Sequence, residues 1–130
     1  MTVILDACQT TVPVGFEANC TAAEAPGDPV VFSKTTAGTV ERLYSNTYDN
    51  RLVVGIIVSK SSDTECIVVT MGILEGIAAG LSEGLPVWIS ETGGVTTTRP
   101  PSGDLQIIGN AVGTDAISVN IEMRKTRVSP

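Results

Sequence analysis

Two serine–lysine pairs come nearest to a catalytic arrangement in this sequence. A lysine can act as the base for a serine nucleophile only where the two side chains meet. On an extended strand, neighbouring side chains point to opposite faces, so adjacent residues cannot share a proton. We therefore expect no catalysis from either pair, Ser33-Lys34 or Ser59-Lys60.

Carboxylates are the second group suited to acid–base chemistry. Asp63 and Glu65 are two residues apart, so on a strand they would share one face, as a cooperating acid and base must. Both lie in a polar stretch typical of a turn, and Asp115 occupies a similar stretch. The simpler interpretation is that all three carboxylates solvate turns.

Neither a metal site nor a cofactor site is predicted. The 130 residues include no histidine, which is the commonest general base and metal ligand. No GxxxxGK[ST] or GxGxxG phosphate cradle is present. Cys8, Cys20 and Cys66 lack metal-site spacing; free thiols are the simplest interpretation, and a bridge between Cys8 and Cys20 is the alternative. The sequence thus predicts a protein that is not an enzyme.

Composition argues against nucleic-acid and membrane partners. The formal net charge of −6 would repel phosphate backbones and anionic lipids. Only 17% of the residues are charged, so we expect some apolar surface to meet another chain. The opening MTVILDACQTTVPV has no basic segment and no long apolar core. We therefore expect no signal peptide and synthesis in the cytoplasm.

The chain contains one β pattern twice. GDPVVFSKTTAGTVERL from Gly27 aligns with GLPVWISETGGVTTTRP from Gly84, an offset of 57 residues. Further on, Gly55 aligns with Gly109, an offset of 54, and each glycine follows two β-branched residues. We expect two similar β units, at about 27–70 and 84–121.

The strand predictions also rest on residue type. Val, Ile and Thr gather in short runs bounded by Gly, Pro, Ser and Asp, as in strands. Residues 51–59 are almost continuously apolar, which predicts a strand covered on both faces. Gly93-Gly94 predicts a hairpin turn. The predicted fold is all-β, a small β-barrel or β-sandwich at 27–123.

Two terminal segments flank this domain. Residues 1–26 are expected to form an extended N-terminal arm, which either tucks in as an edge strand or adds to a neighbouring subunit. The basic tail at 124–130 is either solvated or contacts an acidic neighbour. The candidate partner-binding residues are Val3, Ile4 and Leu5 in the arm and Arg124, Lys125 and Arg127 in the tail.

Three runs carry a family resemblance between about residues 26 and 122. They are PGDPVVFSKTTAGTVERL, DNRLVVGIIVSK and GLSEGLPVWISETGGVTTTRPPSGDLQIIGNAV. In this order they resemble the small capsid decoration (cement) and head-fibre proteins of tailed bacteriophages. The resemblance implies a β module on the outside of an icosahedral head that stabilises the shell by bridging capsomers. The family supplies no catalytic residues.

The resemblance also implies partners and a location. The expected partners are the major capsid protein and further copies of the chain, with a trimer favoured. The expected location is the capsid exterior of the virion. The alternative is a receptor- or carbohydrate-binding module of a phage fibre or adhesin. That function would need exposed aromatic rings, and Trp88, Tyr44 and Tyr48 are few for the purpose.

Overall fold

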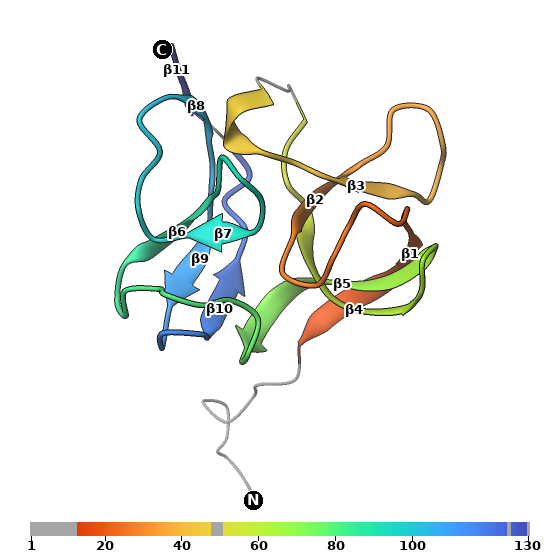
Figure 1. Cartoon of the computed structure of the whole chain (residues 1–130), viewed down its shortest axis with the longest axis horizontal. Helices are drawn as coiled ribbons and strands as arrows, with labels where there is room; N and C mark the ends of the chain where they lie inside the picture. The colour runs from red at the N-terminus through yellow and green to blue at the C-terminus, as the bar shows by residue number, and fades with distance from the viewer. Residues whose placement is uncertain (1–12, 48–50, 125, 130) are drawn as a thin grey trace, which may run out of the picture.

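The computed structural model describes residues 13–47, 51–124 and 126–129. Within these ranges the chain is all-β, with one short 3-10 turn, η2 (Ser45–Thr47), and no α-helix (Figure 1). Nine strands form one curled, half-barrel sheet and two more pair separately. The first-unit strands are β1 (Val14–Asn19), β2 (Pro29–Phe32), β3 (Val40–Arg42), β4 (Gly55–Ser62) and β5 (Glu65–Leu74). The remaining strands are β6 (Pro86–Ile89), β7 (Val95–Thr96), β8 (Gly103–Leu105), β9 (Ile107–Ala111), β10 (Ile117–Asn120) and β11 (Thr126–Val128).

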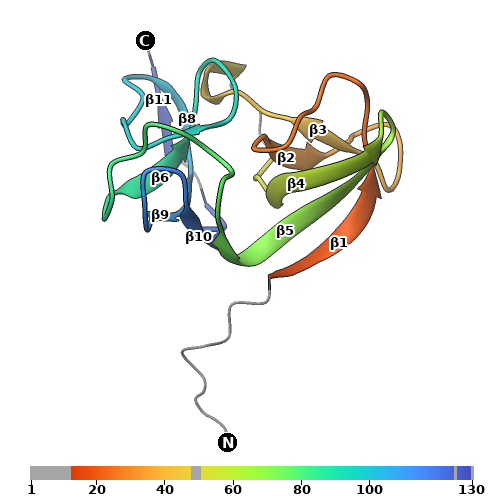
Figure 2. The same ribbon diagram turned by 60° about the horizontal axis from the view of Figure 1, so that its bottom comes forward.

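The predicted all-β fold of two similar units is confirmed by the order of the strands. The sheet runs β3-β2-β4-β5-β10-β9-β6-β7. The first unit contributes the path β3-β2-β4-β5, and the second contributes the matching path β7-β6-β9-β10. The two paths meet where β5 pairs with β10, at the base of the molecule in Figure 2.

Backbone hydrogen bonds outside the strands repeat at the two sequence offsets. In the first unit, Gly27 N donates to Ile57 O over 2.8 Å, and Ile57 N donates to Asp28 O over 3.0 Å. The second unit makes both bonds at the aligned residues: Gly84 N to Ala111 O at 2.8 Å, and Ala111 N to Leu85 O at 2.9 Å.

The two aligned glycines permit the same close approach between strands. A Cβ on Gly55 would lie 2.6 Å from Val69 O, and one on Gly109 would press against Ser118 O. At both glycines the added atom would meet backbone of the next strand in the same unit, which the movement of a side chain cannot relieve. This explains why both copies keep glycine at this position.

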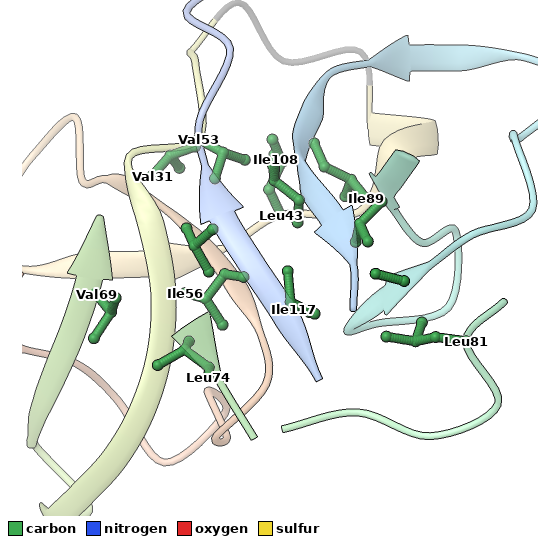
Figure 3. Close-up of a cluster of buried hydrophobic side chains, with 13 residues drawn as sticks. Val31, Leu43, Val53, Ile56, Val69, Leu74, Leu81, Ile89, Ile108 and Ile117 are labelled. Carbon is green, nitrogen blue, oxygen red and sulfur yellow. The ribbon is translucent and has the colours of Figure 1, made fainter. Parts of the chain in front are cut away.

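The buried side chains form two clusters. One cluster, which we call the shared core, takes residues from both units (Figure 3). The other, the first-unit core, contains Cys20, Val30, Val40, Ile57, Cys66 and Val68. Neighbouring residues of β4 belong to different clusters: Ile56 lies in the shared core and Ile57 in the first-unit core, both fully buried. The prediction that 51–59 is covered on both faces is therefore confirmed for the start of β4, Gly55 to Ile57, and is wrong at its end, where Ser59 is exposed.

Part of the expected arm lies in the sheet. Residues 14–19 form β1, which pairs antiparallel with β5. At its end, Asn19 makes an isolated bridge to Thr39 beside β3, so five strands surround the first-unit core. For this part of the arm, the structure agrees with the edge-strand alternative.

A long connection joins the two units after β5. It includes Gly76, Gly80 and Gly84, which together with Gly72 recur at every fourth residue. All four glycines have positive φ, between 68° and 128°. Such a backbone cannot be an α-helix. The connection packs along the second unit through the bond from Leu81 N to Thr114 O at 3.0 Å.

Candidate interaction surfaces

The structure divides the predicted basic tail into residues with different roles. Arg127 lies on β11 opposite Asp104 of β8. Its Nε donates to Asp104 Oδ1 over 2.8 Å, and Asp104 is completely buried. A buried carboxylate needs a charged or hydrogen-bonding partner. Arg127 therefore holds the tail to the domain, and for this residue the structure agrees with the alternative of a contact with an acidic neighbour, here within the same chain.

Of the two described arginines of the tail, Arg124 is the more exposed. Its side chain is 84% exposed and forms an ion pair with Glu122 at 3.1 Å. An exposed pair of this kind is worth less than about 1 kcal/mol, so a partner with a better acidic site can replace Glu122. The other predicted partner-binding residues lie outside the described part of the chain: Val3, Ile4, Leu5 and Lys125.

Neither serine–lysine pair forms a catalytic contact in the structure. Lys60 Nζ donates to the carbonyls of Thr21 and Glu24, both at 2.8 Å. Ser33 Oγ accepts from the backbone N–H groups of Thr35 and Thr36, each at 3.2 Å. Lys60 and Ser33 therefore stabilise the turns around them.

Glu24 is a buried charged residue that the sequence did not reveal. Its side chain is 6% exposed. Oε1 accepts from Thr21 N at 2.7 Å and from Thr21 Oγ at 2.8 Å, while Oε2 accepts from Arg42 N at 3.4 Å. The carboxylate thus ties the turn after β1 to β3. A Thr-x-x-Glu spacing is a recognised local signal, but here it caps a turn instead of a helix.

The two described cysteines are free, buried thiols, as the simplest interpretation of the sequence held. Burial raises the pKa of the Cys66 thiol to about 12, and a hydrogen bond with Cys20 acts in the same direction. Cys20 Sγ also donates to Asp63 O over 3.6 Å. A thiol that stays protonated is a poor nucleophile and metal ligand. Cys8 lies outside the described residues.

The pairing of Asp63 with Glu65 on one strand face is wrong. Asp63 lies in the two-residue turn between β4 and β5, and Glu65 is the first residue of β5. The turn redirects the chain, so the two carboxylates do not share a pleated surface. Asp115 is exposed in the turn before β10, as expected. Among the described residues, no cluster of three or more acids and cysteines is arranged to hold a metal.

A groove lies beside β1 on the first unit. Its polar part is a hollow of about 570 Å³ whose lining includes Asn19, Ser61 and Glu65. Its apolar part is a hollow of about 370 Å³ whose lining includes Pro13 and Val69. Glu17 and Ile67 line both hollows, so the two are adjacent. Pro13, the first described residue, lies at the apolar end.

The outer edge of β1 is open next to this groove. Asn19 N donates to Gly38 O, away from β5. Backbone groups alternate in direction along an antiparallel strand, so the N–H of Glu17 also points away from β5. Among the described strands, none pairs with that edge between Val14 and Ala18. An open edge can take a further strand.

Comparison with known proteins did not assign the chain to a family. No protein-family model and no curated protein matched it. The described residues contain no helix long and apolar enough to cross a membrane.

Proposed function

We propose that the chain is a structural virion protein, a capsid decoration (cement) protein. It binds the outside of a tailed-phage head and stabilises the shell by bridging major capsid protein subunits. The observation that carries the proposal is the open edge of β1 beside a groove on the first unit. This edge adjoins the segment that contains Val3, Ile4 and Leu5, and the sequence resemblance points to the same class of partner.

Strand addition explains how such a contact forms without a deep pocket. Backbone hydrogen bonds along an open edge supply affinity, while alternate side chains enter neighbouring hollows and supply specificity. The apolar part of the groove suits an aliphatic side chain, and the polar part suits a basic or amide side chain beside Glu17 and Glu65. Many equivalent weak contacts on one shell then act together through a high effective concentration.

The carbohydrate-binding alternative has less structural support. Trp88 is half-buried, and the guanidinium of Arg99 lies 5.8 Å from the centre of its ring. Arg42 similarly lies 5.1 Å from the ring centre of Tyr44. A sugar that stacks on the ring face covered by the guanidinium, at Trp88 or at Tyr44, would have to displace that cation. Tyr48 lies outside the described residues.

Co-sedimentation tests the proposal directly. The probe is a preparation of empty heads from the phage that encodes the chain, assembled without it. We expect saturable pelleting of the chain with the heads and a higher thermal midpoint of the loaded shell. Failure to pellet at any concentration, together with binding on a glycan array, would reject the decoration function in favour of the alternative.

Two variants separate the contributions of the arm and the tail. Replacing Val3, Ile4 and Leu5 together with serine should weaken shell binding at least about ten-fold, since each large aliphatic side chain contributes up to ~2 kcal/mol when buried. Arg124→Ala should weaken it less and in a salt-dependent way. Lys34→Ala, at an exposed turn far along the chain from both segments, is the control. Equal binding by all three variants would exclude both segments from the contact.

A further inference from the structure

One face of the second unit is exposed and uncharged. A continuous row of paired residues crosses four strands, from Ile73 through Ser118 and Asn110 to Pro86. Met71 and Asn120 form a second pair on the same side of β5 and β10. These six residues, which we call the open face, contain no ionisable side chain. Figure 2 shows their strands, β5, β10, β9 and β6, side by side.

The alternation of burial establishes the direction of these side chains. Ile117 and Val119 of β10 are buried in the shared core, so Ser118 and Asn120 point to the opposite side. Met71 is 56% exposed and Ile73 is 39% exposed, although both are large apolar residues. Nothing among the described residues packs an apolar cluster over this side of the second unit.

The aligned positions of the first unit are covered. Asn110 aligns with Ile56, which is fully buried in the shared core, and Trp88 aligns with Val31, which is also fully buried. At these two positions the first unit is fully buried, whereas Asn110 is exposed and Trp88 is half-buried. The exposed face of the second unit occupies positions at which the same β unit elsewhere makes an apolar contact.

The polar groups of the open face are complementary to themselves. An asparagine amide and a serine hydroxyl each donate and accept hydrogen bonds, so each can pair with its own kind. A lysine or glutamate at the same site would meet a like charge. The chain carries a net charge of −6, so two copies repel each other least where no charge is present. A second copy of the chain is therefore the partner that this chemistry fits.

We propose that the open face is the contact through which copies of this chain associate. The inference rests on the decoration function proposed above, for which the family resemblance implies association between copies of the chain, but it is measured without shells. The two sheets pack face to face: Met71 and Ile73 supply apolar area, and the side chains of Asn110, Ser118 and Asn120 hydrogen-bond across the contact.

Sedimentation equilibrium of the full chain over a range of concentrations tests this contact. We expect the wild-type chain to associate into a dimer, because a face that pairs with itself is fully occupied when two copies meet. Asn110→Asp changes one amide to a carboxylate of similar size, which brings like charges together, and should raise the dissociation constant about ten-fold or more. Asn46→Asp is the matched control, since Asn46 is exposed on η2 and lies outside the open face. It should leave the dissociation constant unchanged.

A second variant protects the test against misfolding. Met71→Lys places a charge at a different exposed point of the same face and should also dissociate the oligomer. Circular dichroism verifies that each variant keeps its strands. A wild-type chain that stays monomeric at every soluble concentration would overturn the proposal. Association that both open-face variants leave intact would also overturn it. Loss of shell binding by these variants would do the same if the wild-type chain never self-associates.

Discussion

The two units share a strand order but differ in what covers their sheets. In the first unit, β4 places Ile56 in the shared core and Ile57 in the first-unit core. In the second unit, Ala111 of β9 is buried in the shared core while Asn110 is exposed. The same position of the strand is therefore buried inside the molecule in the first unit and exposed on its surface in the second. A duplicated unit can thus acquire a binding face by residue changes on one side of the sheet.

Exchanging the residues at aligned positions should have the largest effect. Ile56→Asn removes a buried aliphatic side chain and buries an amide, so we expect the free energy of unfolding to fall by about 4 kcal/mol. The reciprocal change Asn110→Ile should alter it by less than ~0.5 kcal/mol, because Asn110 is on the surface. Urea denaturation at low protein concentration measures both. Equal losses would show that the two positions are in similar environments and would remove the contrast between the units.

The aligned glycines test the similarity of the units. Gly55→Ala and Gly109→Ala each force a methyl group against backbone of the next strand, and we expect each to cost about 3 kcal/mol of unfolding free energy. Gly113→Ala is the control, since its added Cβ would make an ordinary contact of 3.5 Å with Ala116. A loss at only one of the two aligned glycines would mean that the close approach is not a shared requirement.

The two arginines of the tail should differ. Arg127→Ala leaves the buried carboxylate of Asp104 without its guanidinium, and we expect a loss of about 2 kcal/mol, less than for a fully buried pair because Arg127 is half-exposed. Arg124→Ala should change the unfolding free energy by less than ~0.5 kcal/mol, because its pair with Glu122 is exposed. Thermal denaturation at one pH and ionic strength compares them. Equal effects would contradict a structural role for Arg127 alone.

Much of the fold was predictable because the repeat consists of local patterns of residue type. Gly27 with Gly84 and Gly55 with Gly109 mark positions where the backbone itself restricts the side chain, and such positions survive duplication. In β10, Ile117 and Val119 alternate with polar residues, a pattern that indicates a strand with one buried and one polar face. Pattern alone could not show that the polar face of β10 is open, because that depends on where the connection after β5 packs.

The buried polar contacts could not be predicted, because they join residues far apart in the chain. Gln106 is 1% exposed; its Oε1 accepts from Val53 N at 2.9 Å, and its Nε2 donates to Glu122 O at 2.9 Å. This side chain bridges the two units, yet its neighbours in sequence look like an ordinary strand. The contact between Asp104 and Arg127 could not be predicted either, because it depends on the pairing of β8 with β11.

The smallest expected effect is a pH dependence confined to the first-unit core. The pKa of Cys66 is raised from 9.0 to about 12 in the folded chain. The folded state therefore holds this proton more tightly than the unfolded state, and the resulting stability is complete below pH 9 and lost as the pH rises from 9 towards 12. Between pH 7 and pH 10 we expect Cys66 to account for a loss of about 1 kcal/mol.

Comparing two variants assigns this loss to one unit. Cys66→Ala should remove the part of the fall in unfolding free energy between pH 7 and pH 10 that Cys66 causes. Urea denaturation at each pH measures it. Val87→Ala makes a cavity in the shared core from the second unit without removing a titratable group, so it should lower stability at both pH values and keep the full loss. The shared core contains no cysteine, whereas the first-unit core contains Cys20 and Cys66. The opposite result would be an equal loss of stability in the Cys66→Ala and wild-type chains over this interval. It would mean that the thiol has the same pKa in the folded and unfolded chains, so the first-unit core would have to open independently of the shared core.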